Sequence, residues 1–136
     1  MSQMSDYFED AIRNWYKGTT FPTVPANTYV GLYTATPSDA GGGTEVSGNA
    51  YARQPIVSSG VGWTSGGAGS GSISNALAIT FPAATPAGWG TVTHFGVFDA
   101  VTAGNLLMWN ALGASKTVAI GDVVQFAIGQ LVLTFA

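Results

Sequence analysis

The side chains that could carry acid–base or nucleophilic chemistry are few in this 136-residue chain, which holds one histidine and no cysteine. The histidine, His94, lies in an alternating apolar segment, and no G-x-S-x-G sequence supplies a nucleophilic serine. A zinc site needs three or four ligands, which one histidine without cysteine cannot approach. We therefore expect His94 to be a structural strand residue, and we expect no enzyme activity, no metal site and no cofactor.

The acidic residues beyond the first seventeen positions have neighbours typical of turns, and these residues are Asp39, Glu45, Asp99 and Asp122. Turn formation explains them better than a glycosidase-type acid pair. The glycine-rich segment 66–71 matches neither common phosphate-binding pattern, because no lysine follows it and it opens no helix. We expect this segment to be a flexible loop.

Arg53 is the only lysine or arginine between residues 18 and 115. Only 8% of the chain is charged, so a lone cation is better explained as the bidentate partner of a carboxylate than as a solvated side chain. Glu45, Asp39 and Asp99 are the candidate partners. We predict a structural ion pair between Arg53 and Glu45, with a solvated Arg53 as the alternative.

The charge balance limits the classes of partner. Four basic against seven acidic residues give a net charge of −3, and the four basic residues are too scattered to bind a phosphate backbone or an anionic membrane. No apolar run approaches the roughly 18–20 residues of a spanning helix, and the first ten residues are acidic, unlike a signal peptide. We expect no nucleic acid and no membrane among the partners, and synthesis in a cytoplasm without export.

Residues 5–17 are predicted to form the one helix of the chain. Ser5 or Asp6 can cap its start, and Gly18 can end it in a left-handed conformation. Apolar residues recur at spacings of four, four and three to form a stripe of Met4, Phe8, Ile12 and Trp15. We therefore divide the chain into an N-terminal helical arm, residues 1–18, and a β-sandwich domain, residues 19–136.

The remaining sequence alternates in short runs that are broken by Gly, Pro, Asn and Asp, as strands do. The predicted strands are 28–36, 51–58 with Pro55 marking an edge or a bulge, the alternating run 76–81, and 91–98 paired with 106–112 as a hairpin. The alternation changes phase at Gly129-Gln130, through either a turn between two strands or a bulge in one strand. No helical stretch separates consecutive strands, so we predict a mainly β, antiparallel β-sandwich, or a barrel-like sandwich, with one N-terminal α-helix.

The aromatic residues are mostly assigned to the core, although tryptophans beside glycine or polar residues can also anchor a partner. The candidate interface that follows from this and from the helical stripe comprises Phe8, Ile12, Trp15, Trp63 and Trp89. A carbohydrate-binding module, with Trp63 or Trp89 stacked on a sugar, is a less favoured alternative.

Four local strings occur in order along most of the chain: residues 30–39 (VGLYTATPSD), residues 43–54 (GTEVSGNAYARQ), residues 89–100 (WGTVTHFGVFDA), and residues 104–107 (GNLL) leading into KTV at 116–118 and GD at 121–122. Together they resemble a family of small tailed-bacteriophage virion structural proteins, of the head decoration (cement) or tail-fibre-like kind. The resemblance implies a virion location and a structural role, and it does not distinguish head from tail.

The resemblance agrees with a chain rich in Gly, Ser and Thr and poor in charge, which suits a subunit that buries surface in a symmetric particle. We predict a capsid cement or decoration subunit that bridges major capsid proteins, self-associates as a homotrimer and resides in the virion. The alternative is a tail-fibre or baseplate component. The small size favours decoration, since fibres usually need shaft repeats that this chain lacks.

Overall fold

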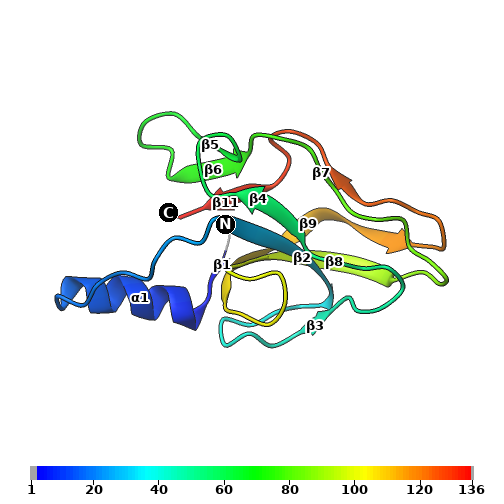
Figure 1. Ribbon diagram of the computed structural model, residues 1–136, viewed down its shortest axis with the longest axis horizontal. Helices are drawn as coiled ribbons and strands as arrows, with labels where there is room; N and C mark the ends of the chain where they lie inside the picture. Colours follow the sequence, from blue (N-terminus) through cyan, green and yellow to red (C-terminus); the bar gives the residue numbers. More distant parts are fainter. Residues whose placement is uncertain (1–2, 136) are drawn as a thin grey trace.

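The computed structural model describes residues 3–135, and antiparallel strands with one α-helix make up its regular structure (Figure 1). Residues 1 and 2 of the predicted helical arm and residue 136 of the predicted β-sandwich domain lie outside the described residues. In chain order the elements are β1 (Gln3–Met4), α1 (Asp6–Tyr16), β2 (Asn27–Ala35), β3 (Thr44–Glu45), β4 (Gln54–Val57), β5 (Trp63–Ser65), β6 (Ser72–Asn75), β7 (Ile79–Thr80), β8 (Gly90–Phe98), β9 (Leu106–Val118), β10 (Gln125–Phe126) and β11 (Val132–Thr134).

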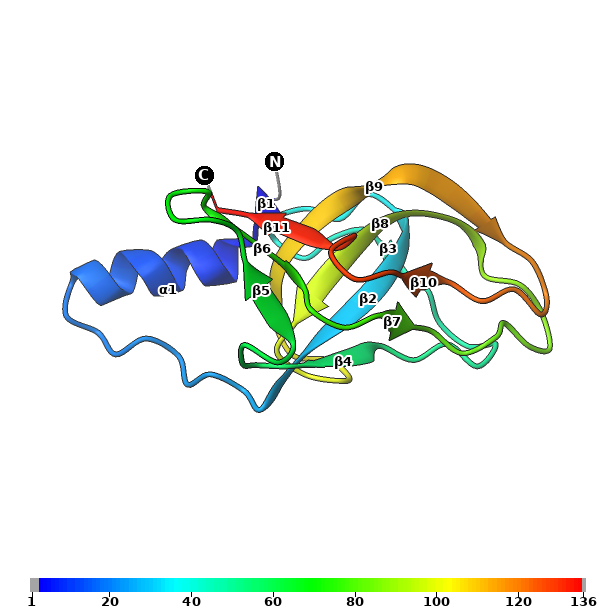
Figure 2. The ribbon, with the colours of Figure 1, turned by 90° about the horizontal axis from the view of Figure 1, so that it is seen from above.

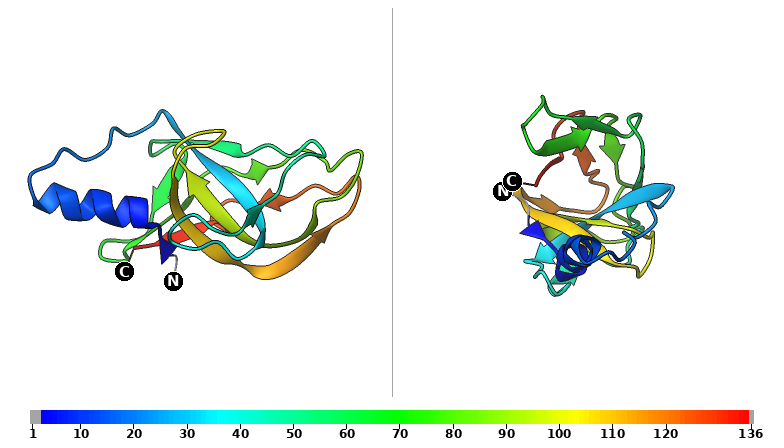
Figure 3. Two further views of the ribbon diagram at one scale, coloured as in Figure 1. Left: turned by 90° about the horizontal axis from the view of Figure 1, so that it is seen from below. Right: turned by 90° about the vertical axis from the view of Figure 1, so that its left-hand side faces the viewer.

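The strands form one large sheet and two small ones. The large sheet has the order β1-β9-β8-β2-β3, and β4 also pairs with β2. The small sheets are β10-β7 and β11-β6-β5, and they lie across from the curled large sheet (Figures 2 and 3). All of these strand pairs are antiparallel. The predicted fold class, a mainly β antiparallel sandwich with one N-terminal helix, is confirmed.

The main core lies between the large sheet and the small sheets. Side chains that alternate along β2, β8 and β9 point into it, as do side chains of the small sheets and their connections; its largest members include Leu32, Phe95, Met108, Phe81, Phe126 and Leu131. A second cluster, Tyr33, Phe98 and Leu106, packs on the other face of the large sheet. Both faces of β2 and β8 are therefore buried where the strands cross the core, which explains the run of four consecutive buried residues in each, Val30–Tyr33 and Phe95–Phe98.

Several predicted strand bounds shift for identifiable reasons. β4 begins at Gln54 and pairs with β2 alone, which places Pro55 on an edge as the missing N–H requires. The run 76–81 contains only the two-residue strand β7. The predicted hairpin of β8 and β9 is confirmed, but β9 continues to Val118 past an irregularity where the register jumps from Ala111 to Lys116.

The change of phase at Gly129-Gln130 is a turn between two strands rather than a bulge in one. The N–H of Gln130 donates to the carbonyl of Ala127 at 3.0 Å, and Gly129 has a φ of +77°. The strands on the two sides belong to different sheets, since β10 pairs with β7 and β11 pairs with β6. The turn therefore carries the chain from one small sheet to the other.

The helix is capped at both ends as the sequence predicts. Ser5 is the N-cap, and its Oγ accepts from the N–H of Phe8 at 3.2 Å. At the other end Gly18, with a φ of +86°, donates to the carbonyl of Trp15 at 3.0 Å, and Thr19 donates to that of Asn14 at 3.0 Å. This pair of bonds is the Schellman arrangement, which ends a helix at a glycine.

The helix is held to the sheet at its start, a feature that the sequence pattern did not predict. The two-residue strand β1 pairs with β9 and adds an edge to the large sheet. Ser5 is buried, its Oγ donates to the carbonyl of Leu106, and the N–H of Asp6 donates to the carbonyl of Asp39 at 2.8 Å. Beyond α1, residues 17–26 return to β2, so both ends of the helical segment connect to the sandwich.

Candidate functional site

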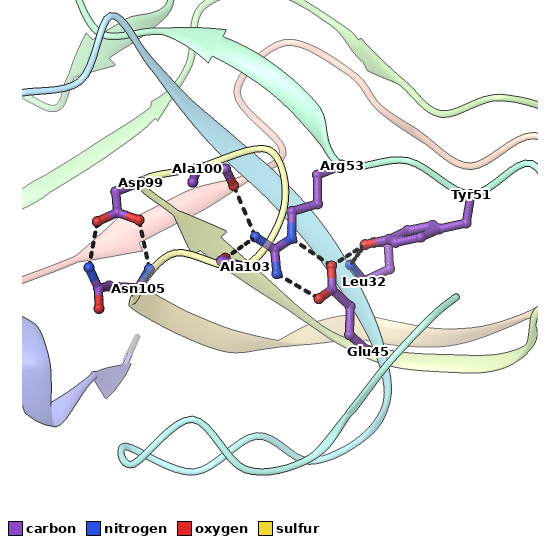
Figure 4. A network of polar contacts seen from close by, with 8 residues as sticks. All are labelled: Leu32, Glu45, Tyr51, Arg53, Asp99, Ala100, Ala103 and Asn105. Carbon is purple, nitrogen blue, oxygen red and sulfur yellow. Dashed lines mark hydrogen bonds and ion pairs between the residues drawn. The ribbon is translucent and has the colours of Figure 1, made fainter. Parts of the chain in front are cut away.

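A closed polar network surrounds Arg53, whose side chain is 8% exposed. Its Nε donates to Oε1 of Glu45 and its Nη2 donates to Oε2, both at 2.7 Å (Figure 4). β3 supplies Glu45, and the chain just before β4 supplies Arg53. Both strands pair with the edge of β2 that β8 does not occupy, so the two residues reach each other along one edge of that strand. A bidentate pair of this kind fixes the direction of both side chains.

The same guanidinium holds the loop between β8 and β9. Its Nη1 donates to the carbonyls of Ala100 at 2.9 Å and Ala103 at 2.8 Å. The loop is also closed at its base, where Asp99 accepts from the backbone N–H of Asn105 at 2.6 Å and from its Nδ2 at 2.8 Å. Arg53 thereby joins the Glu45 segment to a loop 47 to 50 residues further along the chain than Arg53 (Figure 4).

Tyr51 completes the network. Its hydroxyl donates to Oε1 of Glu45 at 2.8 Å and accepts from the N–H of Leu32 at 2.9 Å. Burial, and then the charge of Glu45, raise the pKa of Tyr51 far above its usual value, and the same two causes raise the pKa of Tyr33 to about 12. Both phenols therefore remain protonated near neutral pH, in which form the Tyr51 hydroxyl donates to Glu45.

The electrostatics of the network keep Arg53 charged. Burial alone would lower the pKa of its guanidinium, but the hydrogen bonds and charge of Glu45 outweigh this and raise it. The guanidinium also covers the ring of Phe98, with its carbon 3.4 Å from the ring centroid, in a cation–π contact. Glu45, the carbonyls of Ala100 and Ala103, and the ring of Phe98 thus all contact the one guanidinium.

Glycine is required beneath this network. A Cβ at Gly31 would lie 2.7 Å from Oε1 of Glu45 and 2.9 Å from Cε2 of Phe98. Both contacts are closer than a real Cβ makes, so any side chain at Gly31 displaces the carboxylate. The glycine at position 31 on β2 thus leaves room for the Glu45 carboxylate to lie close to the sheet.

The other candidate partners of Arg53 lie elsewhere. Asp39 accepts from Nε1 of Trp109 at 3.1 Å, and Asp99 holds Asn105 as described. His94 shares a 2.8 Å hydrogen bond with Thr93 through its Nδ1, and its ring centroid lies 5.9 Å from that of Trp109. Burial lowers the pKa of His94. Within residues 3–135 no three His, Asp or Glu side chains gather in a way that could hold a metal ion.

The two candidate tryptophans of the body differ in burial. Trp89 is 7% exposed, contacts Tyr51 and Phe81 edge to face, and donates through Nε1 to the carbonyl of Asn49 at 3.0 Å. Its place in the candidate interface is therefore wrong, because the indole fills the core. Trp63 is half-buried, and its Nε1 donates to Oγ1 of Thr28 at 3.2 Å.

The remaining interface candidates lie on a feature that we call the protrusion, which comprises α1 and residues 17–26 and extends from one end of the sandwich (Figures 2 and 3). No residue of α1 is fully buried. Phe8 and Ile12 are half-buried, and Phe8 packs against the main core and, edge to face at 5.9 Å, against Phe21. Trp15 is 57% exposed and Tyr16 is 79% exposed.

An open apolar cavity of about 210 Å³ lies between α1 and the returning segment of the protrusion. Its lining includes Tyr7 and Phe8 from the helix, Phe21 and Val24 from residues 17–26, and Leu107 from β9. The face of α1 that carries Phe8 is thus only partly covered by the chain itself.

Within the described residues, no helix is long and apolar enough to cross a membrane.

The comparison with protein families agrees with this picture of a structural β protein. A family model described as podophage GP4 fiber I protein gp80 matches residues 3–134. Because the match covers nearly the whole chain, the chain belongs to this family, among the tail-fibre-like structural proteins of phage virions. No curated protein matches the chain.

Proposed function

We propose that this member of a phage fibre family is a non-catalytic subunit of the virion fibre, which attaches to other virion proteins through its protrusion. The observation that carries the proposal is the exposure of aromatic side chains on the protrusion. Trp15 and Tyr16 are 57% and 79% exposed at the far end of α1, where their rings contact each other edge to face. Aromatic side chains of this kind are enriched at protein interfaces.

The polar groups that catalysis would need are engaged in internal contacts. Glu45 is neutralised by Arg53, and Asp99 holds the turn at Asn105. Asp39 accepts from Trp109, which packs beside His94. These contacts give the carboxylates and the imidazole structural tasks, which supports a role in assembly rather than in turnover of a substrate.

A capsid cement or decoration subunit is the second candidate, and the architecture of the described residues supports it. Residues 3–135 form one sandwich, without the repeated units that usually build the shaft of a fibre. A short fibre subunit is compatible with the same observation if several gene products build the fibre. Both candidates use the chain as a structural part of the particle.

Copy number and position in the particle separate the two candidates. We expect quantitative mass spectrometry of purified virions to find a few copies to a few dozen, and antibody labelling in electron micrographs to mark the tail. Hundreds of copies spread over the head would support the cement role instead. Absence of the chain from purified particles would contradict both.

A further inference from the structure

A pocket of about 330 Å³ opens beside the Arg53 network, away from the protrusion. Arg53 and Glu45 both line it, and Val46 and Val101 supply apolar parts of its wall. Val101 belongs to the loop between β8 and β9, which Arg53 holds by two hydrogen bonds. The two sides of the pocket are therefore fixed relative to each other before any ligand binds.

The guanidinium of Arg53 keeps one donor that the chain does not use. An arginine carries five N–H groups, and the four hydrogen bonds of Arg53 use Nε once, Nη1 twice and Nη2 once. The second N–H of Nη2 has no acceptor within residues 3–135, although the side chain is only 8% exposed. A donor on so buried a group costs free energy unless water or a ligand accepts from it.

An unused acceptor lies next to this donor. Oε2 of Glu45 accepts from Nη2 of Arg53 at 2.7 Å, whereas Oε1 accepts from both Arg53 and Tyr51. A carboxylate oxygen can accept two hydrogen bonds, so Oε2 has capacity for one more. The ion pair thus offers one donor and one acceptor, on two atoms 2.7 Å apart, at the pocket that both residues line.

The ligand that fits this pair of atoms is uncharged. An anion would meet the carboxylate of Glu45, and a cation would meet the guanidinium of Arg53, which Glu45 keeps charged by raising its pKa. A primary carboxamide can accept from Nη2 through its oxygen and donate to Oε2 through its NH₂ group at the same time. A trans peptide bond cannot do both, because its C=O and N–H point in opposite directions.

A sugar also carries neighbouring donors and acceptors, but the walls of the pocket suit it less well. Among the described residues that line the pocket, Tyr51 is the one aromatic residue. Its ring packs against Phe81 and Trp89, with centroids 6.1 Å and 5.4 Å away, so its faces are not free to stack on a sugar. Val46 and Val101 instead offer aliphatic surface to the methylene groups of a side chain.

We propose that this pocket binds the carboxamide of an asparagine or glutamine side chain that a partner protein presents. The inference goes beyond the proposed function, because it names a contact site on the body of the protein and the chemical group that the site accepts. It rests on the proposed role in the virion only for the source of that side chain.

NMR spectra of the purified, isotope-labelled full-length chain test the site without any phage. The probe is N-acetylglutamine N-methylamide, and the matched controls are the same derivatives of glutamate and methionine, which add a charge or remove the amide. We expect the glutamine probe to shift the backbone resonances of Ser47 and Thr102, which line the pocket, in a saturable way. Both controls should bind at least about tenfold more weakly, because they leave the donor or the acceptor unmatched.

Filling the pocket provides a second test. Val101 is 50% exposed, so Val101→Trp should fold as stably as the parent chain while its ring occupies the pocket. The matched control is Ile120→Trp, because Ile120 is 64% exposed on the body and does not line the pocket. We expect Val101→Trp to abolish the saturable shifts and Ile120→Trp to keep them. Ala52→Leu fills the pocket from the Arg53 segment and should act as Val101→Trp does.

Three outcomes would overturn this inference. The first is the absence of saturable shifts with the glutamine probe up to its solubility limit. The second is equal affinity for the glutamate or methionine derivative, and the third is tighter binding of methyl glucoside, which indicates a sugar site. None of these outcomes changes whether the chain is found in virions, so the inference and the proposed function fail separately.

Discussion

The Arg53 network and the protrusion use opposite chemistry. In the network, a charged side chain is 8% exposed and donates four hydrogen bonds to acceptors of the same chain. In the protrusion, Trp15 and Tyr16 are more than half exposed at the end of a helix that has no buried residue. The chain thus places part of its small supply of charge inside the fold and part of its aromatic surface outside it.

This difference separates the residues that determine stability from those that determine assembly. A buried charge that loses its partner costs free energy of folding, because the remaining group stays desolvated. An exposed aromatic side chain contributes little to the folded monomer and contributes to binding only when a partner covers it. Substitutions in the two regions should therefore affect different measurements.

The largest loss of stability should come from Arg53→Ala. The change leaves Glu45 without its ion pair and the carbonyls of Ala100 and Ala103 without their donor. We expect the free energy of unfolding in urea to fall by about 2–4 kcal/mol. The control is Lys116→Ala, since Lys116 is exposed and makes one long contact to the carbonyl of Val123, and we expect a cost below about 0.5 kcal/mol there. Equal costs in the two variants would mean that the network does not stabilise the fold.

A smaller loss should follow from Tyr51→Phe. Removing the hydroxyl leaves the N–H of Leu32 without its acceptor and takes one donor from Glu45, while the ring keeps its packing against Trp89. We expect thermal or chemical unfolding to give a cost of about 1–2 kcal/mol. Tyr16→Phe, at an exposed position of the protrusion, should leave stability unchanged. An unchanged free energy of unfolding in Tyr51→Phe would show that the hydroxyl does not stabilise the fold.

The smallest effect is the pH dependence that His94 contributes. Burial lowers its pKa below the value of 6.5 in the unfolded chain, so the unfolded state binds the proton more readily. Its contribution to stability is therefore full above pH 6.5 and declines as the pH falls below that value. We expect His94→Gln to flatten the stability profile between about pH 7 and pH 5. An unchanged slope in that range would exclude His94 as its source.

The fold could be predicted where local rules decide the structure. The capping residues Ser5 and Gly18 and the apolar spacing determine α1, and short apolar runs between turn residues indicate β2 and β8. The two-residue strand β1 has too little sequence to carry a pattern, and it forms because β9 offers a free edge beside Ser5. The predicted boundary at residue 18 separates a helical arm from the sandwich, whereas in the structure both ends of the helical segment connect to the sandwich.

The role of a candidate residue could be predicted when its chemistry restricts the kind of partner that it needs. A lone arginine in a charge-poor chain needs a carboxylate, and the structure brings Arg53 to Glu45. A tryptophan satisfies the same local pattern in a core or at a surface, so the sequence could not distinguish Trp89, which is buried, from Trp15, which is exposed. The carbonyls of Ala100 and Ala103 were also missed, because a backbone acceptor leaves no signal in the sequence.

Incorporation into the phage particle tests most directly the claim that assembly depends on the protrusion. Phage would be prepared with the parent chain, with Trp15→Ser/Tyr16→Ser and with Ile120→Ser, each shown to be folded by its unfolding transition, and copies per particle would be counted by quantitative mass spectrometry. We predict that the double variant is largely lost from particles while Ile120→Ser enters at the parental level. Parental incorporation of the double variant would contradict the claim.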